Sequence, residues 1–305
     1  MLRRMFLTIA AVAVLAGCAG EDAGDTNAGA SGAQNYPVTV GSLTLDRQPT
    51  RIVSLSPTTT EMLYAVGAGR QVTAVDDQSN FPAGVPKTDL SGFKPNAEAV
   101  AQKNPDLVVL TNDTNNIVDQ LTRLKIPVYL APAAKVLDDT YRQITELGTL
   151  TGHATEAADV VGRMKSDIDK LVKELPKRSK SLTYYHELDP TFYTATSKTF
   201  IGSLYALAGL TNIADAADAT GAAAGYPQLS GEAVVQANPD LIFLADTKCC
   251  QQNTDSVRAR PGWSGLTAVK NNQVVNLDDD IASRWGPRVV DLLRAVTGAV
   301  ARVPA

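Results

Sequence analysis

The chain has 305 residues and a formal charge of -4, from 28 basic and 32 acidic side chains, and it contains no Lys/Arg-rich run. This balance argues against a nucleic-acid partner, because such sites need a concentrated basic surface. The length is more than one small core requires, and it suits two domains or one large one.

The first 17 residues have the order of an export signal, in which Arg3 and Arg4 precede an apolar stretch over residues 5–14 and a small-residue processing site. The apolar stretch is shorter than the about 20 residues that a membrane-spanning helix needs. Leu15-Ala16-Gly17-Cys18 resembles the lipobox of bacterial lipoproteins, which implies lipidation of Cys18 and an extracytoplasmic protein anchored to the cell membrane. Residues 18–35 are then the lipidated cysteine and a flexible tether of small and polar residues.

From Thr50 onward, short β-branched or apolar runs alternate with helical segments. Strands are predicted at residues 51–55, 72–75, 107–110 and 128–130. Ser56-Pro57 begins a helix that ends near Gly67-Ala68-Gly69. The alternation predicts a parallel sheet covered by helices, in an N-terminal lobe of residues 36–137.

Residues 138–176 lack strand signals and follow the helical period, with a break at Gly152-His153. The α/β pattern then resumes over residues 177–305. Its expected elements are strands at 181–185, 241–244 and 274–277 and helices at 199–207 and 287–301. The predicted fold class is therefore α/β, with two Rossmann-like α/β lobes joined by one long α-helix and a ligand cleft between the lobes; that this helix is rigid is implied by the resemblance described below.

A repeated unit supports two lobes of similar build. NPDLVVL at residues 104–110 returns as NPDLIFL at 238–244, and the stretches 96–107 and 230–241 align in register. Each copy predicts a short helix with a polar cap that ends before proline and leads into a buried parallel strand.

The stretch RIVSLSP at residues 51–57, the paired NPDL units and the central helix together resemble the substrate-binding proteins of ABC importers for vitamin B12, ferric siderophores and haem, over about Val38 to Val300. The resemblance is strongest to the cobalamin-binding branch. It implies a non-enzymatic, monomeric receptor without a cofactor, which holds a metal chelate between its lobes and delivers it to an ABC permease dimer with a separate ATPase. A corrinoid is the favoured ligand, with a ferric siderophore second and haem as the alternative.

Glu98 and Glu232 occupy equivalent positions in the two copies of the repeat. Each can complement a helix macrodipole, a contribution of about 0.3–1 kcal/mol. The resemblance implies a second role, in which each carboxylate docks onto arginines of the permease, one per lobe.

Aromatic residues on loops that follow predicted strands are candidates for contact with a macrocycle or an aromatic chelate, although each could equally pack within its lobe. They are Phe81, Phe93, Phe192, Tyr193, Tyr226 and Trp285. By resemblance, Phe93, Phe192 and Tyr226 match ring-contacting aromatics of cobalamin binders, whereas Thr111 stands where those proteins have another aromatic.

Two arginines precede the last predicted helix. Arg284 and Arg288 could clamp an anionic chelate, because the guanidinium fork suits oxygen ligands. They could instead pair with the acidic residues 278–280 in a structural turn.

Tyr184-Tyr185-His186-Glu187 has residue types that can ligate haem iron, but a half-buried strand explains them equally well. The only histidines, His153 and His186, are too few for a histidine-rich zinc or manganese site. Cys249 and Cys250 predict either a vicinal disulfide or a redox-labile pair, with loop stiffening favoured over a functional redox or thiol-ligand site.

Two other classes of function have less support. Sequence signatures of serine hydrolases, zinc peptidases and phosphate-binding loops are absent, so a lipid-anchored hydrolase would have to combine His186 and Asp189 with an unrecognised serine. A surface adhesin or scaffold would need no exposed aromatic residues around a pocket.

Overall fold

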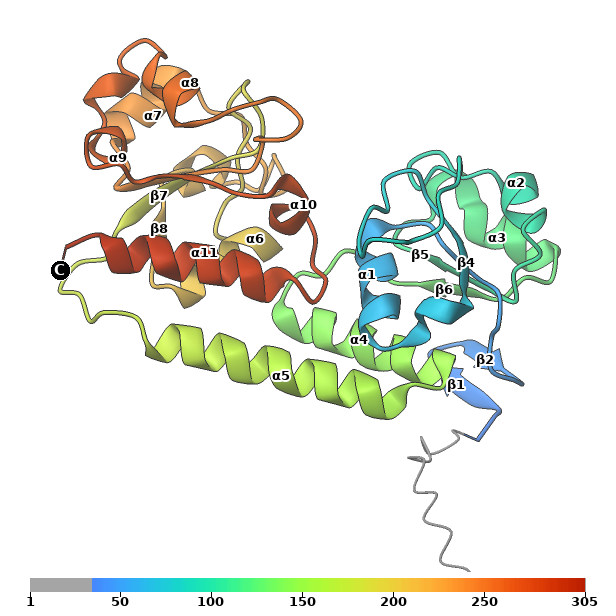
Figure 1. Cartoon of the computed structure of the whole chain (residues 1–305). Helices are drawn as coiled ribbons and strands as arrows, with labels where there is room; N and C mark the ends of the chain where they lie inside the picture. The colour runs from blue at the N-terminus through green and yellow to red at the C-terminus, as the bar shows by residue number, and fades with distance from the viewer. Residues whose placement is uncertain (1–34, 305) are drawn as a thin grey trace, which may run out of the picture. The chain divides into compact units, whose positions relative to one another are not determined.

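The computed structural model describes residues 35–304 (Figure 1). The predicted export signal, Cys18 and nearly all of the tether lie outside the described residues. Among the helices of residues 35–304, none combines the length and the apolar character that crossing a membrane would require. An antiparallel hairpin opens this part of the chain, with β1 (Val38–Val40) paired to β2 (Leu43–Leu45).

The N-terminal lobe is built on four parallel strands, β3 (Ile52–Ser54), β4 (Val72–Val75), β5 (Leu107–Leu110) and β6 (Val128–Leu130). Their spatial order is β4-β3-β5-β6. The connecting helices are α1 (Pro57–Ala65), η1 (Ala68–Gln71), α2 (Ala97–Ala101), η2 (Thr114–Asn116) and α3 (Ile117–Arg123). The strands are short apolar runs, and every residue of β3 and β5 is buried, as expected of a parallel sheet covered on both faces.

The C-terminal lobe repeats this arrangement with β7 (Thr183–Glu187), β8 (Thr211–Asn212), β9 (Leu241–Leu244) and β10 (Val274–Asn276). Their order, β8-β7-β9-β10, is the same as in the first lobe when strands are counted along the chain. The helices of this lobe are α6 (Phe200–Leu207), η3 (Asp215–Asp218), α7 (Gly231–Ala237), α8 (Thr254–Arg258), η4 (Trp263–Gly265), α9 (Thr267–Lys270), α10 (Asp279–Ala282) and α11 (Val289–Arg302). The prediction of two α/β lobes of similar build is confirmed.

The repeated Asn-Pro-Asp has one structural role in both lobes. Asn104 and Asn238 have φ of 51° and 44°, in the left-handed region that asparagine tolerates and that ends a helix. Two residues later, the carboxylate of Asp106 accepts the backbone N–H groups of Thr50 and Arg51. In the second copy, the carboxylate of Asp240 accepts the N–H of Thr183. Each aspartate therefore ties the neighbouring central strand to the strand that it precedes.

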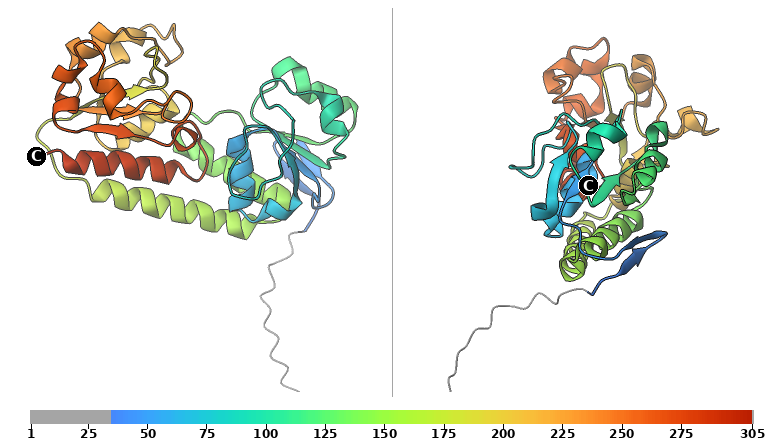
Figure 2. Two further views of the ribbon diagram at one scale, coloured as in Figure 1. Left: turned by 45° about the horizontal axis from the view of Figure 1, so that its top comes forward. Right: turned by 90° about the vertical axis from the view of Figure 1, so that its right-hand side faces the viewer.

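A helical layer joins the two lobes. It consists of α4 (Leu137–Thr151), α5 (Ala154–Lys173) and the C-terminal α11, which run along one side of both sheets (Figures 1 and 2). Gly152, with φ of 79°, closes α4 before α5 begins. Apolar residues of these helices belong to one hydrophobic core that also includes Met62 of the first lobe and Phe243 of the second. A shared core resists relative rotation of the lobes, because any rotation must disturb close packing.

Most predicted strands agree with the structure to within a residue or two. The first strand of the second lobe is the largest difference, since it was expected at residues 181–185 and lies at 183–187. Its start is determined by Asp240, which holds the N–H of Thr183, and its pairing with β9 begins at Tyr184. The hairpin β1–β2 and the two-residue β8 were not predicted.

Candidate ligand-binding site

The carboxyl ends of the two sheets are joined by hydrogen bonds. Asn80, on the loop after β4, donates to Asp280 Oδ2 at 3.0 Å and accepts from Arg284 Nη1 at 3.0 Å. Arg284 Nη2 also donates to the carbonyl of Gln78 at 3.3 Å. Since ligands of open α/β sheets bind at the carboxyl ends of strands, this contact marks the region in which a ligand between the lobes would lie.

Glu61 of α1 is the centre of this contact. It is 3% exposed, and its carboxylate accepts from Arg284 Nη1 at 2.7 Å and from Arg288 Nε at 2.9 Å. The bond to Glu61 raises the pKa of Arg288, and its guanidinium also lies 4.1 Å from the ring centre of Phe81. Arg284 pairs with Asp280 at 2.8 Å as well. We call Glu61, Asp280, Arg284 and Arg288 the interlobe ion cluster.

The sequence left two roles open for Arg284 and Arg288, which were to clamp an anionic chelate or to pair with acidic residues in a structural turn. The ion pairs in the structure favour the second role. Arg284 makes the predicted pairing with the acidic turn, and both guanidiniums also pair with Glu61 of the other lobe. Trp285 is likewise engaged, because its indole N–H donates to Gln143 Oε1 at 2.9 Å. Its ring packs against the shared core.

Four aromatic side chains remain exposed on loops at these carboxyl ends. The exposed fractions are 42% for Phe81, 74% for Phe93, 43% for Tyr193 and 43% for Tyr226. Residues 193–196 and 225–228 are held together by backbone hydrogen bonds, including that from Thr194 to Pro227. We call Phe81, Phe93, Tyr193 and Tyr226 the exposed aromatic group.

Glycine positions two of these rings. A Cβ on Gly92, just before Phe93, would lie 2.6 Å from the carbonyl oxygen of Leu55, so the loop approaches the sheet closely only with glycine there. Gly225, just before Tyr226, has φ of 91° and would place a Cβ 2.6 Å from a Thr199 methyl. The backbone therefore presents both rings in a defined place.

Phe192 lies apart from the exposed aromatic group. Its φ of 71° is unusual for a bulky residue. Its ring stacks on Trp263 at 5.7 Å between centres, and the Arg260 guanidinium lies over both rings. These side chains line a cavity of about 1130 Å³ within the C-terminal lobe, which also includes Glu232 and Val235.

The predicted haem-ligand motif is buried inside the second sheet. Tyr184, Tyr185 and His186 are 1%, 0% and 0% exposed, respectively. His186 Nδ1 is hydrogen-bonded to the Tyr205 hydroxyl at 2.7 Å, and burial lowers the pKa of His186 to about 4. An axial-ligand role for this motif is therefore wrong, because these side chains do not reach the surface.

The same burial argues against a hydrolase that uses His186 together with Asp189. Asp189 accepts from the N–H and hydroxyl of Thr191 in its own exposed loop, whereas His186 pairs with Tyr205. Within residues 35–304, no group of three or more His, Cys, Asp or Glu side chains is placed to hold a metal ion.

A buried carboxylate pair was missed by the sequence analysis. Glu187 and Asp246, at the ends of β7 and β9, are both fully buried. Arg260 binds Glu187 through two bonds of 2.6 Å, while neither oxygen of Asp246 has a hydrogen-bond partner among the described residues. Burial, with the nearby charge of Glu187, raises the pKa of Asp246 to about 7. Only the spatial adjacency of β7 and β9 could have identified the pair.

The predicted docking residues are exposed and equivalent. Glu98 lies in the first turn of α2 and Glu232 in the first turn of α7. Their caps also correspond, since the side chain of Asn96 accepts the N–H of Ala99 and that of Ser230 accepts the N–H of Ala233. In the described part of the chain, neither glutamate forms an ion pair.

Comparison with known proteins identifies the family. A family model described as periplasmic binding protein matches residues 52–281. An uncharacterized ABC transporter substrate-binding lipoprotein of Bacillus subtilis is 30% identical over 93% of this chain and 92% of its own length. A cobalamin-binding protein of Halobacterium salinarum is 29% identical over 90% of this chain and 76% of its own length.

Solved structures agree with this assignment. A possible iron-binding periplasmic protein of Staphylococcus epidermidis superposes with a TM-score of 0.70 at 27% identity, covering 83% of this chain and 99% of that one. The vitamin B12-binding protein of Vibrio cholerae has the same fold, with a TM-score of 0.69 at 24% identity, covering 83% of this chain and 96% of that one. The prediction of a non-enzymatic substrate-binding protein is confirmed, and the chain belongs to the periplasmic binding protein family.

Proposed function

We propose that this protein captures a corrinoid, with cobalamin as the representative ligand, and delivers it to an ABC permease. The exposed aromatic group is the observation that carries the proposal. Phe81, Phe93, Tyr193 and Tyr226 come from both lobes and stay exposed on loops at the carboxyl ends of the sheets. Burying such rings against a large, partly apolar ring system is favourable, since each aromatic side chain can bury about 150–250 Å².

The charges near this group favour a ligand without a high negative charge. Arg284 and Arg288 are paired to Glu61 and Asp280, so the interlobe ion cluster has two positive and two negative side chains. An anionic ferric siderophore would have to compete with these carboxylates for the guanidiniums. The relatives named as cobalamin-binding support the same choice.

A ferric siderophore is the second candidate. The hydroxyls of Tyr193 and Tyr226 on the exposed surface and the iron-binding title of the S. epidermidis structure favour it. Haem is the third candidate, and it would have to use these two tyrosines because Tyr184, Tyr185 and His186 are buried.

In this proposal, the lipid on Cys18 holds a monomeric receptor at the outer side of the cell membrane. Glu98 and Glu232, one on each lobe, then pair with basic residues of the permease. Exposed carboxylates at equivalent places on two lobes suit orientation of a partner more than raw affinity. Hydrolysis of ATP belongs to a separate subunit.

The test is a titration of the full-length protein with cyanocobalamin, a ferric hydroxamate, a ferric catecholate and haem, followed by absorbance and thermal shift. A ligand at a hundredfold excess over its dissociation constant stabilises the fold by about 2.7 kcal/mol. Phe93→Ala and Tyr226→Ala should each weaken cyanocobalamin binding at least tenfold. Leu124→Ala, at a 51% exposed position directly after the C-terminus of α3, is the control and should bind normally. If cyanocobalamin changes neither the absorbance nor the thermal stability of the wild-type protein, the corrinoid proposal is excluded.

A further inference from the structure

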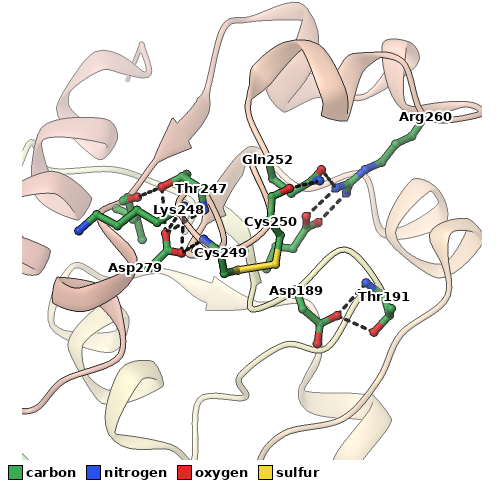
Figure 3. Close-up of a disulfide and its surroundings, with 11 residues drawn as sticks. Asp189, Thr191, Thr247, Lys248, Cys249, Cys250, Gln252, Arg260 and Asp279 are labelled. Atoms are coloured by element: carbon green, nitrogen blue, oxygen red, sulfur yellow. Dashed lines mark hydrogen bonds and ion pairs between the residues drawn. A yellow bond between two sulfur atoms is a disulfide. The ribbon is translucent and has the colours of Figure 1, made fainter. Parts of the chain in front are cut away.

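The loop between β9 and α8, residues 245–253, carries a disulfide between the adjacent cysteines Cys249 and Cys250 (Figure 3). We call it the disulfide loop. It follows the carboxyl end of β9, which lies between β7 and β10 in the sheet. The loop therefore has the exposed Tyr193 segment after β7 on one side and the turn into α10 on the other.

The first half of the disulfide loop is anchored to α10. The backbone N–H groups of Thr247, Lys248 and Cys249 all donate to the carboxylate of Asp279, at 2.8, 3.0 and 2.9 Å. The Lys248 ammonium pairs with Asp280 at 2.8 Å. Because Asp280 belongs to the interlobe ion cluster and also binds Arg284, the loop contacts that cluster directly through Lys248.

The second half is anchored to the buried carboxylate pair. Gln252 Oε1 accepts from Arg260 Nη2 at 2.7 Å, and Arg260 holds Glu187. The N–H groups of Cys250 and Gln252 both donate to the carbonyl of Asp246 at 3.3 Å. The disulfide thus lies between two attachment points of the loop. On one side the loop is hydrogen-bonded to Asp279, and on the other side it is hydrogen-bonded to Arg260, as Figure 3 shows.

This disulfide is open to reduction. The Cα atoms of Cys249 and Cys250 are 3.8 Å apart, below the usual 4.4–6.8 Å of disulfides, and such deviations make the bond easier to reduce. Cys249 is exposed, so an incoming thiolate has access to its sulfur. The half-buried Cys250 is the leaving group in that attack.

We infer that Cys249–Cys250 is a modification site for an extracytoplasmic dithiol reductant of the thioredoxin type, and that reduction releases the disulfide loop from Asp279. A reductant thiolate bonds to Cys249 Sγ while the Sγ–Sγ bond breaks, and Cys250 leaves as a thiolate that takes up a proton. The second thiol of the reductant then attacks the mixed disulfide, which frees the Cys249 thiol and leaves the reductant oxidised. Two electrons and two protons pass to this protein.

Release follows from the backbone geometry that the ring imposes. In the disulfide, the peptide between the two cysteines is locked in an eight-membered ring, which holds the Cys249 N–H on Asp279 and the Cys250 N–H on Asp246. The dithiol removes this constraint and restores ordinary φ/ψ freedom to both residues. The hydrogen bonds from Thr247 and Lys248 to Asp279 are weakened at the same time, because the adjacent Cys249 is no longer held in place.

The experiment incubates the full-length protein with thioredoxin, thioredoxin reductase and NADPH. We expect one NADPH consumed per chain, two new alkylation sites that map to Cys249 and Cys250, and hydrogen exchange at least tenfold faster in peptides covering residues 247–249. The double variant Cys249→Ser/Cys250→Ser should consume no NADPH and exchange fast from the start. Peptides from β7 should not change in either protein.

Resistance of the bond to thioredoxin, cysteines that are already free in air-oxidised protein, or unchanged exchange after complete reduction would each overturn the inference. A further arm, which rests on the proposed function, predicts that reduction weakens cyanocobalamin binding about fivefold. If the oxidised protein does not bind cyanocobalamin, the proposed function fails, while NADPH consumption and hydrogen exchange still decide the inference.

Discussion

Replacing Glu61 by alanine tests the interlobe ion cluster. The variant removes the only carboxylate that binds Arg288 among the described residues and leaves Asp280 as the one carboxylate that binds Arg284 there. The side chains of Arg284 and Arg288 are 9% and 18% exposed, so the two charges stay largely shielded from water. Removing one partner of a buried ion pair costs about 3–5 kcal/mol. Because Asp280 still neutralises Arg284, we expect a loss near the lower end, about 3 kcal/mol.

Urea unfolding measures this loss as a change in midpoint at an unchanged dependence on denaturant. Arg294→Gln is the matched control, because it removes an ion pair with Asp291 whose side chains are 55% and 47% exposed. Such exposed pairs contribute about 0–1 kcal/mol. The double variant Glu61→Met/Arg288→Met should recover much of the loss, since an apolar pair replaces an unpaired charge. A loss below about 1 kcal/mol for Glu61→Ala would refute the reasoning.

Three further outcomes are expected. The pKa of Asp246 is raised to about 7, so the folded state holds a proton that the unfolded state releases above pH 4, and the contribution of this group to stability falls as pH rises from 4 to 7. Buried His186, whose pKa is lowered to about 4, contributes in the opposite direction, so the readout is the difference between two proteins: in thermal unfolding, Asp246→Asn should gain stability relative to wild type as pH rises from 4 to 7. Gly92→Ala places a methyl 2.6 Å from the Leu55 carbonyl oxygen and should weaken cyanocobalamin binding at least fivefold by displacing the adjacent aromatic ring, as calorimetry would measure. Reversing the charges of Glu98 and Glu232 together should abolish uptake of labelled cobalamin by cells while leaving binding by the purified variant unchanged.

Each of these outcomes has a counterpart that would count against it. A stability difference between Asp246→Asn and wild type that stays constant from pH 4 to 7 would mean that Asp246 is not the titrating group. Unchanged affinity in Gly92→Ala would separate this loop from the ligand. Uptake that survives the double charge reversal would exclude docking through the two glutamates.

The helices and strands could be predicted from the sequence because they depend on residues that are close together in the chain. Val72–Val75 and Leu107–Leu110 are short apolar runs bounded by breaking residues, and both form strands at the predicted positions. The repeat predicted a pair of matching supersecondary units because Asn104 and Asn238 adopt the same left-handed conformation and Asp106 and Asp240 make the same strand contacts.

The partners of buried charged side chains could not be predicted from the sequence. Glu61 and Arg288 are separated by more than 200 residues along the chain, and no periodicity connects them. Glu187 and Asp246 meet only because β7 and β9 pair in the sheet. The motif Tyr184–Glu187 was ambiguous for the same reason, since a strand that alternates between two covered faces has no exposed side.

The sequence by itself therefore determined most of the elements, the duplicated lobe and the family, because helix periods, turn residues and the paired NPDL units are encoded over a few neighbouring positions. Tertiary structure alone decided which side chains are free to meet a ligand. Arg284, Trp285 and Arg288 found partners on the other lobe or on α4, whereas Phe93 and Tyr226 stayed exposed. The physical reason is that burial and pairing are properties of positions brought together by folding, and a single side chain carries no record of its distant neighbours.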